Sequence, residues 1–336
     1  MKKLVEQWCE SYPFTNEEKE IFLKPENSIY FDWINEIEYD HMKKMFLARL
    51  PYSKIDKNNC EISFDVSETS IINKIKDEFV DDDTIVITTD QEHPSVLKMV
   101  QSCKNYYIMK YQVEVIWMQY NDLIDKIKDF KKVVVIINGV KVATGEFTPQ
   151  LFFIKLKNIL RNKKSIIILD DAQGMFLHKR DYSIFDYVFG TCHAMIDAYD
   201  AGICISIGNN KPLGTKAYAI GLNYLYSLDL ILARIDKLNI FSNIMEEYFY
   251  DKIVEQKLFN LDNTIHSRRV PYLFDLDDKL KIFTETQMEL LNKHKISVDG
   301  FGTQQHTLRF RGHQYLDQPE LLLKGLDIIQ TILENV

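Results

Sequence analysis

Polar side chains able to do chemistry follow two apolar runs in the middle of the chain. Asp170 and Gln173 come after the β-branched run 166–169, and Thr191 and His193 come after the next short run. A continuous apolar run of this length is typical of a strand buried on both faces, and open α/β sheets bind ligands at their strand ends. We therefore expect a carboxylate, an amide, a hydroxyl and an imidazole to line one crevice.

The elements that must position these residues alternate between strand and helix. Strands are expected from residue 61 and at 84–88, 113–118, 133–138, 166–169, 187–189 and 203–207. Helices are expected after a turn in which Ser67 or Thr69 is the N-cap, from Pro94, at 121–130 and at 149–161. This order predicts an α/β fold in three layers, a mainly parallel sheet covered by helices on both faces.

The pattern changes towards both ends of the chain. We expect a helical extension at 1–55, a large α/β domain at 56–215 and connecting helices at 216–255. A smaller C-terminal α+β domain is expected at 256–336, with strands at 270–276, 295–301 and 306–312.

Composition limits the classes of function. The 336 residues carry a net charge of −8 with no basic block, which argues against nucleic acid as a partner. No apolar run reaches the roughly 18 residues that a membrane span needs, and the N-terminus lacks a signal-peptide pattern, so we expect a cytoplasmic protein without membrane contact. Five cysteines without a CxxC pair predict reduced thiols, and the sequence predicts no metal site.

The order of the motifs resembles the fold-type I enzymes that depend on pyridoxal phosphate (PLP), in particular the class V aminotransferase and cysteine desulfurase group. The resemblance runs from Glu61 to the C-terminus and depends on short motifs: Glu92-His93, Asp170-Asp171-Ala172-Gln173, Thr191-Cys192-His193 and Leu308-Arg309-Phe310-Arg311. It implies the PLP-dependent transferase-like fold, a dimer and a small amino-acid-like ligand.

The resemblance also implies roles for single residues. Asp170 would keep the pyridine nitrogen protonated, which makes the ring an electron sink, and Gln173 would contact the ring oxygen. His93 would stack on the ring and, with His193, is an expected catalytic residue. The further cofactor-binding residues at the phosphate are Thr69, Thr191 and His193, and Arg309 would bind the substrate carboxylate.

Several residues depart from the pattern of this family. Ala194 stands where the family has the lysine that forms the Schiff base, and a methyl group cannot form an imine. Glu68 stands in the phosphate turn, where it would repel a phosphate, and Val142 replaces a polar residue that meets the ring oxygen. No cysteine follows Cys204, which argues against desulfurase activity.

These departures leave several functions open. One is a divergent PLP-enzyme-like transferase or lyase that holds PLP non-covalently or not at all, with His193 as the base for proton transfer. Another is a non-catalytic homologue that serves as a binding or scaffold subunit of a homodimer or heterodimer. Ala194 as an engineered replacement, and Lys211 or Lys216 as a displaced Schiff-base lysine, are further alternatives.

Overall fold

The structure is a computed structural model of the whole chain. It describes residues 36–50, 55–56, 58–110, 116–141, 147–175, 180–191 and 202–215. Beyond these it describes residues 273–275, 285–294 and 307–309, together with scattered helical positions between 233 and 332.

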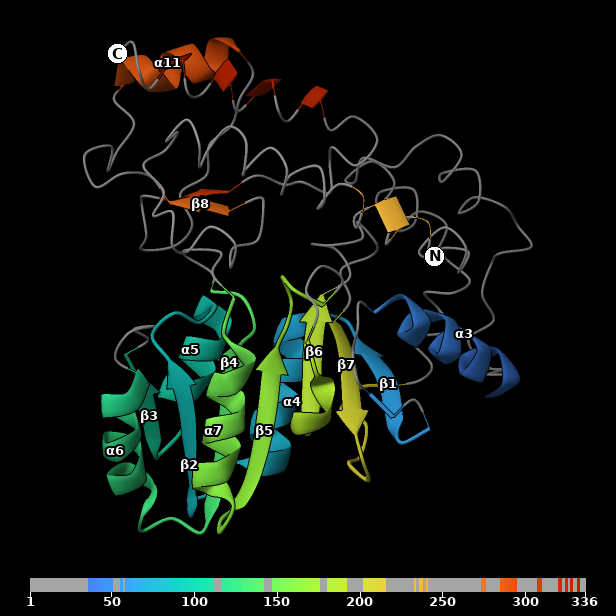
Figure 1. Cartoon of the computed structure of the whole chain (residues 1–336), viewed down its shortest axis with the longest axis vertical. Coiled ribbons are helices and arrows are strands. Elements are labelled where there is room, and N and C mark those ends of the chain that lie inside the picture. The colour runs from blue at the N-terminus through green and yellow to red at the C-terminus, as the bar shows by residue number, and fades with distance from the viewer. Residues whose placement is uncertain are drawn as a thin grey trace.

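A seven-stranded sheet is the larger of the two sheets in the described part of the chain. Its strands are β1 (Cys60–Asp65), β2 (Thr84–Thr89), β3 (Tyr106–Met109), β4 (Lys132–Asn138), β5 (Lys164–Asp170), β6 (Tyr187–Thr191) and β7 (Gly202–Ile207). They lie in the order β1-β7-β6-β5-β4-β2-β3. β7 runs antiparallel to both neighbours, and the other pairs are parallel, so β7 points the opposite way in Figure 1. The parallel strands therefore all end at one side of the sheet, which we call the carboxyl edge.

Helices cover both faces of this sheet (Figure 1). The helices α4 (Glu68–Phe79) and α5 (Pro94–Gln101) pack on one face with alternate strand residues such as Val134 and Ile136. The helices α3 (Glu36–Arg49), α6 (Ile116–Ile127) and α7 (Gln150–Leu160) pack on the other face with Val133 and Val135. Side chains on a strand alternate between faces, so near-continuous apolar runs fill both cores. The predicted three-layer α/β fold is confirmed.

The start of α4 shows how the sequence fixes one of these helices. Ser67 is its N-cap, and the Ser67 hydroxyl accepts a hydrogen bond from the Ser70 amide over 3.1 Å, which confirms the expectation from sequence. Ile71, Ile72 and Ile75 recur at helical spacing and are buried against the sheet. Burying each of them stabilises the fold by roughly 1.5–3 kcal/mol.

The predicted strand at 113–118 is wrong where the structure describes it. Residues from Ile116 onward form α6, and the helical spacing of the buried Tyr120, Leu123 and Ile127 explains why. The strand of this region is β3, which the sequence reading missed. β3 pairs only with β2, at the end of the sheet, and Tyr106 is 47% exposed, so β3 lacks the apolar run of an inner strand.

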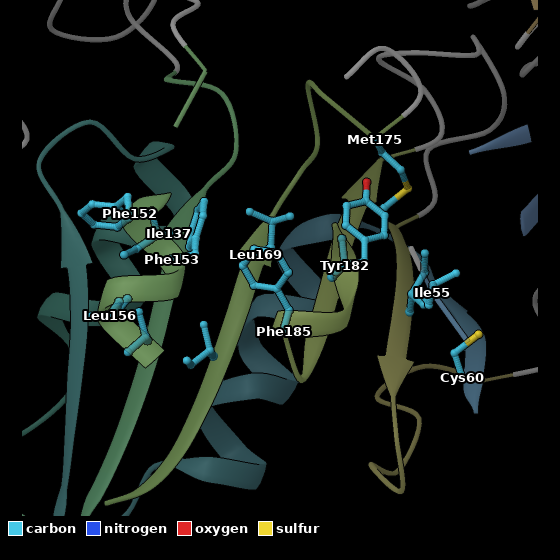
Figure 2. Packing of buried hydrophobic residues seen from close by; sticks show 14 of the residues in the cluster. Ile55, Cys60, Ile137, Phe152, Phe153, Leu156, Leu169, Met175, Tyr182 and Phe185 are labelled. Carbon is cyan, nitrogen blue, oxygen red and sulfur yellow. The ribbon is translucent and has the colours of Figure 1, made fainter. Parts of the chain in front are cut away.

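Aromatic residues pack the core between α7 and the sheet (Figure 2). The Phe153 ring meets the Phe185 ring edge-on, with their centroids 4.8 Å apart, and Phe152 contacts Phe153 in the same way. Phe185 follows the short 3-10 helix η2 (Tyr182–Ile184), which connects β5 to β6. These contacts fix the segment that follows the end of β5.

The described C-terminal part contains β8 (Leu273–Asp275), paired antiparallel with β9 (Thr307–Arg309), and the helix α11 (Glu285–Lys293). β8 lies within the predicted strand 270–276, and β9 lies within the predicted strand 306–312. The predicted strand 295–301 falls outside the described residues. The division of the chain into domains stays a prediction. Among the described residues, no helix is long and apolar enough to cross a membrane.

Candidate functional site

The ends of three strands bring the predicted polar residues to one place on the carboxyl edge. Asn138 at the end of β4 is in register with Asp170 at the end of β5, and β6 follows with Thr191 at its end. By the alternation along each strand, Asn138, Asp170 and Thr191 share the sheet face of α4 and α5. The helices α4 and α5 begin at the same edge, with Glu68 and His93 at their starts. We call these residues and their neighbours the candidate site.

Asp170 is the carboxyl group at the centre of this site. It is 4% exposed, and its Oδ1 accepts a hydrogen bond from the Ala172 amide over 3.1 Å. Burial, followed by the charges of Glu68 and Glu92, raises the pKa of Asp170 well above its usual range. The charges of Glu68 and Glu92 thus act in the same direction as burial, and all three favour the protonated form of the Asp170 carboxyl.

Glu92 is the second buried carboxyl group of the site. Its Oε1 accepts a hydrogen bond from the Thr89 hydroxyl over 2.6 Å, and its Oε2 accepts one from the Asn138 amide over 2.9 Å. Burial raises the pKa of Glu92 to about 7, although the charge of Lys141 and these two hydrogen bonds act in the opposite direction. Glu92 therefore exchanges a proton near neutral pH.

Lys141 is a buried cation three residues after β4. Its side chain has no exposed surface, and its Nζ donates hydrogen bonds to Asn138 Oδ1 over 3.0 Å and to Thr89 Oγ1 over 3.4 Å. It therefore joins the ends of β4 and β2 beside Glu92. Lysine is almost never buried without a structural or chemical reason.

His93 and Thr69, two of the expected cofactor-binding residues, lie at the starts of α5 and α4. His93 caps α5: its Nδ1 accepts a hydrogen bond from the Ser95 amide over 3.3 Å and lies 2.6 Å from the Ser95 hydroxyl. Thr69 lies in the first turn of α4 and is exposed. The roles predicted for His93 and Thr69 stay predictions.

Of the other expected site residues, the structure describes Gln173, Thr191 and Arg309. Gln173 and Thr191 are buried at the carboxyl edge, at 8% and 4% exposure. Arg309 ends β9, where it pairs with Leu273. The expectations for His193, Ala194, Val142 and Lys216 fall on residues outside the described part of the chain.

Lys211 is not placed to be a displaced Schiff-base lysine. It follows β7, which runs away from the carboxyl edge, and its carbonyl oxygen accepts a hydrogen bond from the Tyr187 hydroxyl at the start of β6. It is also exposed to solvent. Lys211 therefore lies at the opposite edge of the sheet, which corrects that alternative.

Asp171 belongs to a separate buried network on the face of α7. Its Oδ2 accepts a hydrogen bond from the Tyr182 hydroxyl, and the nearby Arg180 donates hydrogen bonds to the carbonyl oxygens of Gly139 and Thr148. Burial raises the pKa of Asp171, while Arg180 and Tyr182 lower it. The two adjacent aspartates thus point to opposite faces, and Asp171 fixes the turn that carries Gln173.

Comparison with solved structures identifies the architecture. A NifS-like protein from Rickettsia africae aligns with a TM-score of 0.65 at 13% identity, covering 95% of this chain and 97% of that one. A phosphoserine aminotransferase from Cytophaga hutchinsonii aligns with a TM-score of 0.62 at 14% identity, covering 94% and 95%. The chain has the PLP-dependent transferase-like fold.

A ureidoglycine-glyoxylate aminotransferase from Bacillus subtilis shares this fold, with a TM-score of 0.62 at 13% identity over 95% of this chain and 89% of that one. No protein-family model matches the chain, and no curated protein matches it in sequence. At such low identity the likeness shows the fold alone.

The described side chains fit one end of PLP and not the other. The buried Asp170 has the chemistry to pair with a pyridine nitrogen. At the start of α4, however, the charge of Glu68 acts on Asp170, and a phosphate dianion placed there would face a carboxylate. The described donor set therefore does not fit the phosphate group.

Sequence reasoning gave no site role to Asn138, Glu92 or Lys141. Asn138 had a usable signal, because it ends the apolar run 133–137 in the same way that Asp170 ends its run. Glu92 was noted only as the neighbour of His93. Nothing local in the sequence marks Lys141, because its burial follows from the packing of separate strand ends.

Metal ligands and cysteines add no further chemistry to the described part of the chain. No group of His, Cys, Asp and Glu residues there could hold a metal ion. The described cysteines Cys60, Cys103 and Cys204 are buried free thiols, and burial raises the pKa of Cys204 to about 12. Such a thiol is inert.

Proposed function

We propose that this protein is a divergent aminotransferase-like protein that binds, or acts on, a small amino-acid-like ligand at the candidate site. In this proposal PLP is either held non-covalently or absent, and the carboxylate of Glu68 at the phosphate end favours its absence. Ala194 has no amine with which to tether a cofactor.

The observation that supports this proposal is the group of three carboxyls formed by Glu68, Glu92 and Asp170. Glu68 and Glu92 are close enough to raise the pKa of Asp170. An ammonium group bound among them would relieve this repulsion and favour the ionised carboxylates. A primary amine, such as that of an amino acid, is therefore the ligand whose charge suits this edge.

Further residues complete the proposal. Gln173 and Thr191 offer neutral hydrogen-bonding groups at the same edge, Arg309 would bind the ligand carboxylate, and His193 would move protons. A chemical step needs these last two residues, whereas binding of the amine needs only the carboxyls. Binding of the amine is therefore the property to measure first.

Calorimetric titration tests this function. We expect a set of amino acids to include ligands that bind the wild-type protein, and Asp170→Asn to weaken their binding by about ten-fold or more. Asp82→Asn is the matched control, because Asp82 is an exposed carboxylate at the opposite edge, before β2. Equal loss in both variants, or binding of PLP alone with no response to any amine, would refute the proposal.

A second candidate function is a non-catalytic subunit of a homodimer or heterodimer in the cytoplasm. Exposed Leu151 and Ile154 lie one turn apart at the start of α7, at 56% and 40% exposure, and form an apolar pair on its outer surface. Light scattering of the wild-type protein and of Leu151→Lys tests this. A stable dimer that the substitution dissociates, combined with no amine binding, favours the subunit role.

A further inference from the structure

Lys141 lies fully buried at the carboxyl ends of β2 and β4, beside the candidate site. Its Nζ is 3.0 Å from Asn138 Oδ1, and Asn138 is the residue of β4 in register with Asp170. The amine is thus one strand away from the central carboxyl group of the site. On the chain it lies well before Ala194, the residue that interrupts the sequence resemblance.

A carboxyl group that exchanges protons stands next to this amine. Burial raises the pKa of Glu92, and the charge of Lys141 is the largest single cause that lowers it. The two side chains therefore interact electrostatically. Both also contact Thr89 Oγ1, at 2.6 Å from Glu92 and 3.4 Å from Lys141. Glu92 is therefore placed to take the proton that the ammonium group must lose before it can act as a nucleophile.

We propose that Lys141 forms an imine with a small aldehyde or 2-oxo acid that enters the candidate site. The neutral Nζ attacks the carbonyl carbon and a carbon–nitrogen bond forms. The carbonyl oxygen then leaves as water, so that R₂C=O and the lysine amine give R₂C=N–Lys141 and one molecule of water. No oxidant or reductant is needed.

The nearby groups limit the size and kind of this carbonyl compound. Because Lys141 has no exposed surface, only a small compound reaches its amine. The turn before Glu92 also holds the Gln91 Oε1, a buried acceptor for which the described structure gives no donor. A carbonyl compound that bears its own hydroxyl or amine donor would satisfy that atom.

This inference goes beyond the proposed function, because binding of an amine on the carboxyl groups does not require Lys141. A purely structural role is the competing explanation: the ammonium group would then only hold the ends of β2 and β4 together through Thr89 and Asn138. The two roles differ in whether the amine becomes covalently modified.

Reductive trapping tests the inference on the full chain. The protein is incubated with glyoxylate and cyanoborohydride, and the modified residue is located by peptide mapping. We expect about one modification per chain at Lys141, at least about ten-fold faster than at any exposed lysine, since Glu92 lies beside this amine to take its proton. Lys141→Arg keeps the charge and should abolish this modification, whereas Lys211→Arg, at an exposed lysine of the opposite edge, should leave it unchanged.

Peptide mapping of the wild-type protein decides the question even where the Lys141→Arg variant does not fold. Modification only at exposed lysines, or an equal rate in wild type and Lys141→Arg, would overturn the inference. Amino-acid binding measured by calorimetry is a separate readout, so a failure at Lys141 is distinguishable from a failure of the proposed function.

Discussion

The pH dependence of stability should depend strongly on Glu92. Burial raises the pKa of this carboxyl from 4.5 to about 7 in the folded protein. A group with a raised folded-state pKa binds its proton more tightly in the folded state, so its stabilising contribution is complete below about pH 4.5 and is lost as the pH rises through about 7. The protein should therefore become less stable between these values.

The size of this loss follows from the shift in pKa. A shift of one unit corresponds to 1.36 kcal/mol, so the Glu92 carboxyl alone should lower the free energy of unfolding by about 3 kcal/mol between pH 4 and pH 8. Asp170 changes stability in the same direction, since its pKa is also raised by burial and neighbouring carboxyls.

Urea unfolding of wild type and Glu92→Gln at a series of pH values tests this reasoning. The substitution also changes hydrogen bonds to Thr89 and Asn138, so the informative quantity is the change of the free energy of unfolding with pH within each protein. We expect this change to be about 3 kcal/mol smaller in Glu92→Gln. Glu78→Gln, at an exposed carboxylate of α4, should behave like the wild type.

The same pH dependence in wild type and Glu92→Gln would refute the claim that this carboxyl is buried and protonated in the folded state. A weaker infrared band of protonated carboxyls near pH 6 in Glu92→Gln than in the wild type would give independent evidence for it; part of the band should remain, because burial also raises the pKa values of Asp170 and Asp171.

Three other substitutions have expected effects on the free energy of unfolding in urea. Ser67→Ala removes the N-cap of α4 and should cost about 1 kcal/mol, whereas Ser67→Asn should retain most of the stability. Tyr182→Phe removes a donor from the buried Asp171 carboxylate and should cost about 1–3 kcal/mol; an unchanged midpoint would show that the hydrogen bond contributes nothing. Gly214→Ala would place a Cβ 2.4 Å from the Phe64 carbonyl oxygen, so a loss of at least about 1–3 kcal/mol is expected, and wild-type stability would contradict the close packing of this turn on β1.

Much of the fold could be predicted from the sequence because its inner strands are continuous apolar runs. The runs 133–137 and 167–169 are buried on both faces, and such burial favours apolar side chains at every position. β3 has no comparable signal, since an edge strand packs on fewer neighbours. The β-branched residues of 113–118 are typical of a strand, but from Ile116 onward the chain forms α6.

The candidate site could be predicted only in part. Asp170, Gln173 and Thr191 follow their strands directly, so the strand pattern alone locates them. Lys141 and Glu92 meet only because β2 and β4 are neighbours in the sheet, which is a property of the topology. The distribution of charge at this edge therefore depends on which strands are adjacent, and the local sequence does not contain that information.

The position of β7 also sets the order in which the chain can fold during synthesis. β1 pairs only with β7 in the sheet, from Cys60 opposite Ile207 to Asp65 opposite Gly202, and so waits for a segment made some 140 residues later. The neighbouring strands β2, β3, β4 and β5 have short connections and can pair earlier. β1 therefore stays unpaired until residues up to 207 have emerged from the ribosome. The start of α4, with Glu68, follows β1 directly and reaches its final place only after β1 pairs with β7.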